Sequence, residues 1–206
     1  SEYNSSVQMS SALHKPVNTV CLAVMYAGLA EKFGDRAGTV VWDSYEGGSV
    51  GPDGTHGSLS LFDASGDNLL TSMGKPPSAA YWASYITNTV WLDPDGENDL
   101  LPVTYERSSR LRGYAVRTKD EYRLLLINAG FDTLETTVAL GDHRFATVDI
   151  MQWNEKNYSW HSGAGKEFAL PNCGPVSRRV SGQALESIII PPVSIVVAVF
   201  TDHPKT

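Results

Sequence analysis

The chain has 206 residues, of which 42% are hydrophobic and 19% charged, a composition ordinary for globular proteins and unlike that of disordered chains. Its formal net charge is −7, so it lacks the excess of lysine and arginine with which proteins neutralise nucleic-acid phosphates. The longest apolar stretches, residues 20–30 and 188–200, are shorter than the roughly 20 residues that cross a bilayer. We therefore expect neither a nucleic-acid partner nor a membrane-spanning helix.

The first predicted element is a helix over residues 16–33. Pro16 suits its first turn, apolar residues recur every three or four positions, and Gly34 supplies a C-terminal stop. The apolar face covers more than half of the circumference, which favours a helix packed against a sheet. The β-branched run Gly38–Asp43 then predicts a buried parallel strand, so the chain opens as an α/β layer.

A polar loop rich in Gly, Ser and Asp follows over residues 44–57, at the carboxyl end of the predicted strand, where α/β folds build their sites. Residues 58–63 alternate like a strand, and a second helix is predicted after Pro76-Pro77-Ser78, ending near Trp91. The polar segment Asp93–Asp99 is predicted as a hinge, because the hydrophobic period changes beyond it. Its aspartates have calcium-like spacing but lack the terminal glutamate of a full calcium loop, so a plain hinge is favoured.

Beyond the hinge the sequence predicts short strands separated by turns, with Lys119-Asp120 as a tight hairpin turn. The expected strands span residues 100–106, 111–118, 121–128, 134–140, 147–153, 187–190 and 193–201. Such a series is typical of an antiparallel sandwich. The expected fold class is α+β, mainly β, with a short α/β segment over residues 1–92 and an antiparallel β-sandwich over residues 93–206.

Four segments resemble retaining glycoside hydrolases of the (β/α)8-barrel clan that includes cellulases, xylanases and arabinofuranosidases. Ser1-Glu2-Tyr3-Asn4 is similar to the end of barrel strand seven, and Val40-Val41-Trp42-Asp43 is similar to strand eight. Ser78–Trp82 resembles the final barrel helix, and Pro192-Val193-Ser194 resembles the turn into the last strand of the C-terminal sandwich. The resemblance implies the C-terminal part of such an enzyme: the last strands of a barrel followed by a β-sandwich.

The resemblance also implies roles for individual residues. Glu2 would be the nucleophile, and Trp42 would be a platform on which a sugar ring stacks. The alternatives are a solvated carboxylate at Glu2 and a core tryptophan at Trp42. The other candidate substrate contacts, which would otherwise be ordinary residues of a terminus and a loop, are Tyr3, Asn4, Tyr45, Glu46 and His56.

No metal or cofactor is expected, since the histidines are scattered and the glycine-rich loop follows no phosphate-binding or dinucleotide-binding spacing. A retaining glycosidase also needs a general acid, and the barrel strand that carries it is not among these residues. The resemblance therefore implies a carbohydrate substrate, a β-linked polysaccharide, and a partner: the missing N-terminal barrel portion, in the same precursor or as a second chain. The chain alone is expected to be inactive. An extracellular or periplasmic location is inferred from this function, although no signal peptide is visible.

Two further sets of residues leave alternatives open. Cys21 and Cys173 belong to no Cys-x-x-Cys pair, and either two buried free thiols or one disulfide would account for them. Trp153, Tyr158 and Trp160 would suit a carbohydrate-binding face if they were exposed, which would make the chain a non-catalytic accessory module. A packed core or a contact between domains is the other interpretation of these aromatic residues.

Overall fold

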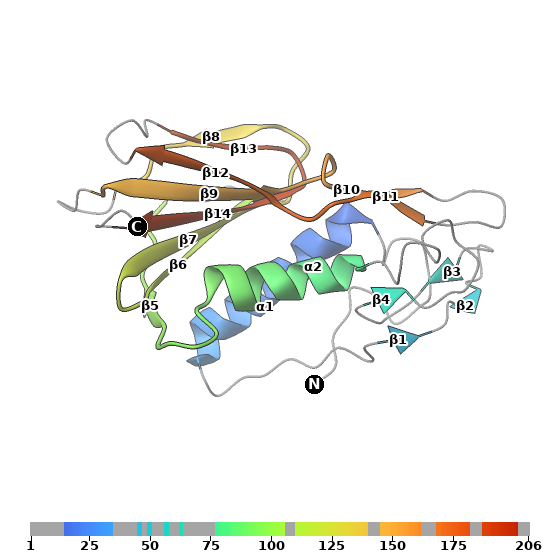
Figure 1. The fold of residues 1–206 in the computed structure, drawn as a ribbon, viewed down its shortest axis with the longest axis horizontal. Helices are drawn as coiled ribbons and strands as arrows, with labels where there is room; N and C mark the ends of the chain where they lie inside the picture. Colours follow the sequence, from blue (N-terminus) through green and yellow to red (C-terminus); the bar gives the residue numbers. More distant parts are fainter. Residues whose placement is uncertain are drawn as a thin grey trace. The chain divides into compact units, whose positions relative to one another are not determined.

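The computed structural model describes residues 15–34, 77–105, 110–139, 145–161, 168–181 and 187–201, and the backbone of four two-residue strands between residues 45 and 63. The fold is α+β, mainly β, as the sequence predicts, with mostly antiparallel sheets (Figure 1). The chain forms two compact units. Unit 1 comprises residues 1–85 and 155–174, and unit 2 comprises residues 86–154 and 175–206. The domain division expected at residue 92 remains a prediction.

Helix α1 of unit 1, Pro16–Phe33, has the predicted bounds. Pro16 lies in the first turn, where its missing N–H costs no hydrogen bond. Gly34 ends the helix with a φ of 57° and donates its N–H to the carbonyl of Ala30. Lys32 lies in the last turn, where a cation interacts favourably with the helix dipole. No helix in the described residues is long and apolar enough to cross a membrane.

Helix α2, Ala79–Tyr85, packs against α1. At the start of α2, the hydroxyl of Thr19 donates a 3.0 Å hydrogen bond to the carbonyl of Ala79. Alanines on the contact face of α2 let the two helices approach closely, because a methyl group takes little space between the axes. The side chains that pack together are Leu22, Met25, Tyr26, Ala80 and Ala83.

The described strands of unit 1 are short and form three pairs. The pairs are β1 (Tyr45–Glu46) with β4 (Phe62–Asp63), β2 (Ser49–Val50) with β3 (His56–Gly57), and β10 (Tyr158–His161) with β11 (Phe168–Asn172). Among these described pairs, β1 and β4 run parallel and the other two are antiparallel. The strand expected over residues 38–43 lies outside the described residues, and only 62–63 are described of the strand expected over 58–63.

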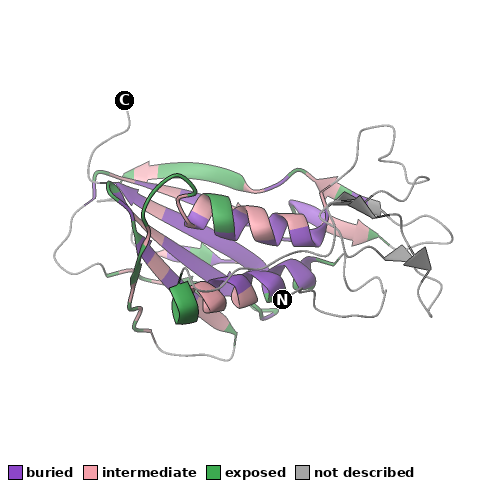
Figure 2. Ribbon diagram, turned by 90° about the horizontal axis from the view of Figure 1, so that it is seen from below, coloured by how far each residue is buried: buried purple, intermediate pink, exposed green. Residues whose placement is uncertain are grey.

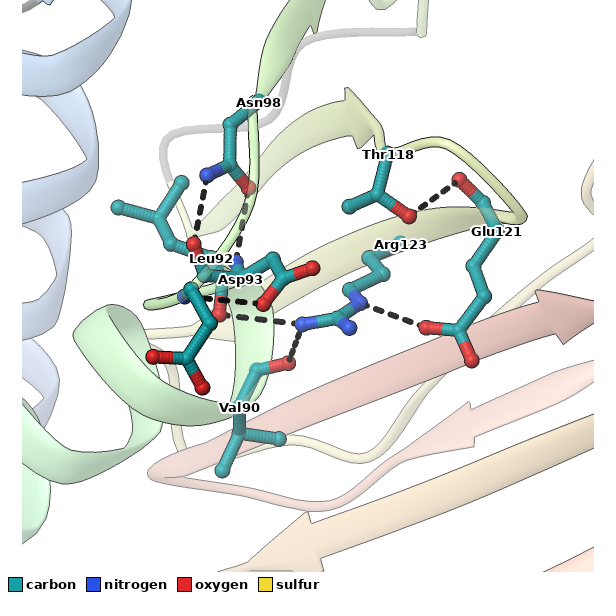
Figure 3. Close-up of polar contacts among 8 residues, drawn as sticks. Val90, Leu92, Asp93, Asn98, Thr118, Glu121 and Arg123 are labelled. Carbon is teal, nitrogen blue, oxygen red and sulfur yellow. Dashed lines mark hydrogen bonds and ion pairs between the residues drawn. The ribbon is translucent and has the colours of Figure 1, made fainter.

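Unit 2 begins with the π-helical segment η4, Ile86–Trp91, so the second predicted helix ends at the expected residue. The loop after it is closed by Asn98, whose Oδ1 accepts the N–H of Asp93 at 2.8 Å (Figure 3). The Asn98 amide donates in return to the carbonyls of Asp93 and Gly96, at 2.8 and 3.1 Å. The N–H of Asp95 donates to the Asp93 carboxylate at 3.2 Å, so the hinge segment is held by its own side chains.

The large sheet of unit 2 has six antiparallel strands in the order β12-β9-β14-β7-β6-β5. Two strands have the predicted bounds, and the Lys119-Asp120 hairpin turn is confirmed by a 2.9 Å hydrogen bond from the N–H of Thr118 to the carbonyl of Glu121. The strands are β5 (Asp99–Leu101), β6 (Leu111–Arg117), β7 (Glu121–Asn128), β9 (Thr147–Trp153), β12 (Val176–Ser181) and β14 (Ser194–Thr201).

The sequence did not predict β10, β11 or β12. Strand β11 contains Pro171, which removes a ladder donor and argued against a strand. Strand β12 is an edge strand whose side chains are nearly all exposed, so it lacks the alternation of apolar and polar residues that marks a half-buried strand. Arg179 on this edge forms an ion pair with Asp149 of β9, 2.6 Å from Nε to Oδ1.

The main core of unit 2 lies between one face of the large sheet and a second pair of strands, β8 (Leu134–Thr136) and β13 (Ile188–Ile190). Both strands are shorter than expected. Figure 2 shows the long strands of the large sheet mainly in purple, the colour of buried residues. The buried core side chains are Leu124, Leu126, Phe145, Val148, Ile150, Ile188, Ile190, Val196, Ala198 and Phe200.

The opposite face of the large sheet is buried as well. Leu125, Ile127 and Ile195 are at most 1% exposed, and Trp91 of η4 lies 6.0 Å from Tyr114 of β6 between ring centroids. A strand that is buried on both faces has a continuous run of apolar residues. This explains why apolar and polar residues alternate little in β7 and β14.

The two cysteines are free, which settles the alternative that the sequence left open. Both are exposed, however, so the expectation of buried thiols is wrong. Cys21 directly precedes Leu22, which packs against α2, and successive residues of a helix point about 100° apart, so the Cys21 side chain points away from that contact.

Candidate functional site

The predicted nucleophile and its neighbours lie outside the described residues. This applies to Glu2, Tyr3, Asn4 and Trp42 alike, so their roles remain predictions. Of the loop candidates, Tyr45 and Glu46 form β1 and His56 opens β3, and the structure describes their backbone only.

The backbone register of these short strands brings some candidates beside residues that the sequence analysis did not select. Tyr45 pairs with Phe62 and Glu46 pairs with Asp63 in the parallel ladder, while His56 pairs with Val50 in the antiparallel one. Neighbouring strands lie about 4.8 Å apart, so Asp63 is an acidic residue adjacent to Glu46. No signal in the sequence indicated this pairing, because Glu46 lies in the segment that was predicted to be a loop.

The helical frame of unit 1 places Tyr26 inside the α1–α2 contact. Its side chain is 6% exposed, and among the described residues its hydroxyl has no hydrogen-bond partner. Burial raises the pKa of the phenol, because the charged form would lose its hydration. Tyr26 is therefore a neutral packing residue at physiological pH and no candidate for a general base.

Helix α2 carries three aromatic side chains. The rings of Tyr81 and Tyr85 are nearly parallel, at 5°, with centroids 6.0 Å apart. Trp82 meets both of them edge to face, at centroid distances of 5.0 and 6.1 Å. Trp82 is buried, whereas the two tyrosines are half-buried. In the segment that resembles the final barrel helix, Trp82 is thus an internal anchor.

The hairpin β10–β11 holds this tryptophan within unit 1. The indole Nε1 of Trp82 donates to Oδ1 of Asn172 at 2.7 Å, and the Asn172 amide donates to the carbonyl of Pro77 at 2.7 Å. Gly174, with a φ of 76°, lies so close to the ring that an added Cβ would be 2.6 Å from Cη2. The sequence analysis missed both residues, and the only signal was the turn-like run Asn172-Cys173-Gly174.

The aromatic residues that would have formed a carbohydrate-binding face of the sandwich are largely inaccessible. Trp153 and Tyr158 are 0% exposed and Trp160 is half-buried. Two of the three rings therefore cannot stack on a sugar, and packing inside the protein is the confirmed interpretation for them. Among the described residues the most exposed large hydrophobic side chain is Phe131, at 83%, in the loop between β7 and β8.

A buried ion pair lies at the start of β7, on the face that packs against η4. Arg123 Nε donates to Glu121 Oε2 at 2.9 Å, and the two side chains are 15% and 6% exposed (Figure 3). The guanidinium also donates to the carbonyls of Val90 and Leu92, at 3.3 and 3.1 Å. These carbonyls end the π-helical segment and have no helical partner further along, so a cation there stabilises the helix end.

This cluster fixes structure and offers no chemistry of its own, because both charges are satisfied by each other and by the backbone. In the described part of the chain, no group of three or more His, Cys, Asp or Glu side chains is placed to hold a metal ion.

Comparison with known proteins indicates the class of fold. No protein-family model matches the chain, and no curated protein sequence matches it. Solved glycoside hydrolase structures do resemble it. A family 30 subfamily 8 xylanase from Clostridium acetobutylicum matches with a TM-score of 0.59 and 11% identity, over 98% of this chain and 41% of the xylanase. An arabinose-bound α-L-arabinofuranosidase, MgGH51, matches with a TM-score of 0.63 and 13% identity, over 98% of this chain and 32% of that one.

A family 30 endoxylanase from Clostridium papyrosolvens gives a TM-score of 0.52 at 13% identity, over 98% of this chain and 41% of the enzyme. The chain thus spans about a third to two fifths of the length of the glycoside hydrolases that it matches. At these identities the likeness shows the fold, which is similar to a portion of these enzymes.

Proposed function

We propose that the chain is the C-terminal portion of a retaining glycoside hydrolase that acts on β-linked polysaccharide. Glu2 supplies the nucleophile, Trp42 stacks against a sugar ring, and the β-sandwich braces the barrel. The observation that carries the proposal is the likeness over 98% of the chain to 41% of a xylanase. The location that follows from this function is extracellular or periplasmic.

The chemistry sets what the rest of the enzyme must supply. The Glu2 carboxylate attacks the anomeric carbon, and the glycosidic C–O bond breaks as a general acid protonates the departing oxygen. The two carboxyl groups must lie about 5 to 5.5 Å apart in a retaining enzyme. The general acid comes from the remaining barrel portion, which belongs to the same precursor or is a second chain.

The residues on one side of α1 support the presence of such a partner. Val17, Cys21, Val24 and Gly28 follow each other at spacings of four, three and four, which places them on one side of the helix. Val17 is 42% exposed, Cys21 is exposed, and Val24 and Gly28 are half-buried. A helix with apolar residues on both sides is typical of a barrel, where neighbouring helices and the central strands cover it.

The first test is native mass spectrometry of the protein purified from the cells that make it, with hydrolysis assays on aryl glycosides and β-glucans. We expect a mass well above that of this chain, together with hydrolysis. Glu2→Gln should abolish hydrolysis and leave folding intact, whereas the control Glu97→Gln, in the exposed hinge, should leave the rate unchanged. A single inactive species with the mass of this chain alone would contradict the proposal.

The thiol of Cys21 offers a second test, because it lies on the side of α1 that the barrel portion would cover. Alkylation of Cys21 should be fast in the isolated chain and at least about tenfold slower in the complete enzyme. Cys173 is also exposed and lies off this helix, so it serves as the internal control. Equal reactivity of Cys21 in both preparations would place the partner elsewhere.

A further inference from the structure

Unit 2 contains a cavity of about 160 Å³ at the edge of the core described above. Its floor is the face of β6 and β7 that carries Leu111, Gly113, Leu124 and Leu126. Its walls are the segments 101–105 and 136–139. All of these residues belong to unit 2, so the cavity is a property of the sandwich itself.

Gly113 explains why the sheet is hollow at this point. An added Cβ would lie 3.6 Å from Leu126 Cδ2, 3.6 Å from Val103 Cγ1 and 3.7 Å from Tyr105 Cε1, all ordinary contact distances. Glycine in a strand interior weakens the strand and often marks a place where another group approaches closely. Here the missing side chain leaves the space beneath Val103 and Tyr105 unfilled.

The walls above this floor are not fixed by a strand ladder. Residues 102–105 and 137–139 belong to no strand in the described part of the chain, and Ala139 is exposed. Small movements of the walls can therefore accommodate a bound small molecule, here called the guest. The floor is held by the pairing of β6 with β7.

The lining determines the chemistry of a guest. None of the described residues that line the cavity carries a charge, and the polar ones among them are Thr104, Tyr105, Thr136 and Thr137. A charged guest would lose its hydration without gaining an opposite charge, which is strongly unfavourable. The described lining therefore favours an uncharged guest.

The volume limits the guest to one ring. An engineered apolar cavity of about 150 Å³ holds benzene, whereas drug-sized ligands occupy roughly 300 to 1,000 Å³. A pyranose has the right size, but it carries hydroxyl groups around its whole rim. The floor has no polar side chain, and the Thr136 hydroxyl already donates to the carbonyl of Thr137, so sugar hydroxyl groups would be left unpaired, which opposes binding. We infer that the sandwich unit binds one small, uncharged aromatic molecule in this cavity, independently of any sugar bound elsewhere.

Fluorobenzene is a suitable probe, because the fluorine nucleus reports binding directly. We expect saturable binding to the full chain at one site, with shifts of the methyl signals of Leu111, Leu124 and Leu126. The methyl signals of Ile195, on the opposite face of the sheet, should not move. Saturation with xylose at the same methyl groups, with no response to fluorobenzene, would overturn the inference.

Two variants narrow the cavity in different ways. Gly113→Ala adds a methyl group to the floor at ordinary contact distances, and Ala139→Phe fills the mouth from an exposed wall position. Each should weaken fluorobenzene binding at least about tenfold. The control Val176→Ala, on the exposed edge strand, should bind as the unchanged chain does. Unaltered binding in both cavity variants, with folding verified by circular dichroism, would refute the site.

Discussion

The indole of Trp82 and the side-chain amide of Asn172 are joined by a 2.7 Å hydrogen bond across 90 residues of chain. The same amide donates to the carbonyl of Pro77, at the start of α2. One asparagine therefore satisfies a side-chain donor and a backbone acceptor in unit 1.

Asn172→Ala should destabilise unit 1, because it removes the partners of both groups at once. Leaving a buried polar group unpaired costs about 1 to 3 kcal/mol, so we expect a loss of about 2 kcal/mol for these part-buried groups. Urea unfolding followed by tryptophan fluorescence measures the change. Trp82→Phe removes only the indole donor, and a double-mutant cycle between the two positions should give a coupling of opposite sign to the single losses. Purely additive losses would contradict the bond.

Gly174→Ala should be more destabilising than Gly34→Ala. Both glycines have positive φ, 76° and 57°, and an alanine there costs on the order of 1 kcal/mol in backbone strain. Only at Gly174 would the new Cβ also lie 2.6 Å from the Trp82 ring, whereas at Gly34 nothing lies within 4 Å. Thermal unfolding of the two variants side by side separates the contact from the strain. Equal losses would show that the ring moves away freely.

Arg123→Met should cost about 3 to 5 kcal/mol, because it leaves Glu121 charged, 6% exposed and without its cation. The carbonyls of Val90 and Leu92 lose their donor at the same time. The matched control is Arg110→Met, since its ion pair with Asp132 is 55% and 70% exposed and contributes at most about 1 kcal/mol. Chemical denaturation of unit 2 reports both values. A small effect at Arg123 would mean that water reaches the pair.

Stability should fall as the pH rises above the ordinary pKa of a cysteine thiol, 9.0. The Cys21 side chain is exposed, but the neighbouring atoms of the protein desolvate its thiol in part and so raise its pKa, and burial raises the pKa of Tyr26. Their contribution is therefore fully present below the unfolded-state pKa and is lost as the pH rises through the folded-state pKa. Urea midpoints between about pH 8 and pH 11 measure this slope.

The variants Cys21→Ser and Tyr26→Phe should each flatten the alkaline decline. Tyr26→Phe should leave stability near neutral pH almost unchanged, since among the described residues the hydroxyl has no partner to lose. If both variants lose stability with rising pH as steeply as the unchanged chain does, the decline belongs to other groups.

The sequence predicted the elements whose ends carry strong local signals. Helix α1 begins at Pro16 and stops before Gly34, and the bounds of β7 and β9 follow from apolar runs between turns. The missed strand β12 lies exposed at an edge, and β11 contains Pro171, so the local pattern argued against strands that pairing with neighbours nevertheless stabilises.

The contacts around the candidate sites were less accessible to sequence analysis. Nothing local to Asn172 indicates that its partner is Trp82, because such a bond depends on the fold of the whole unit. The burial of Trp153 and Tyr158 likewise depends on what packs over them. The pair Glu121 and Arg123 had a usable signal, since opposite charges two residues apart inside an apolar strand point to the same face.

The hairpin of residues 155–174 has a consequence for how the protein folds. Unit 1 is built from two separate stretches of chain, and the second stretch follows β9 of unit 2. During synthesis α2 leaves the ribosome about 90 residues before Asn172, and such distant closures are slow. Helix α2 must therefore wait for most of unit 2 to be made before its tryptophan is locked in place. A chain that stops at the hinge lacks both Asn172 and Gly174, and it should yield a loosely packed, aggregation-prone helical pair.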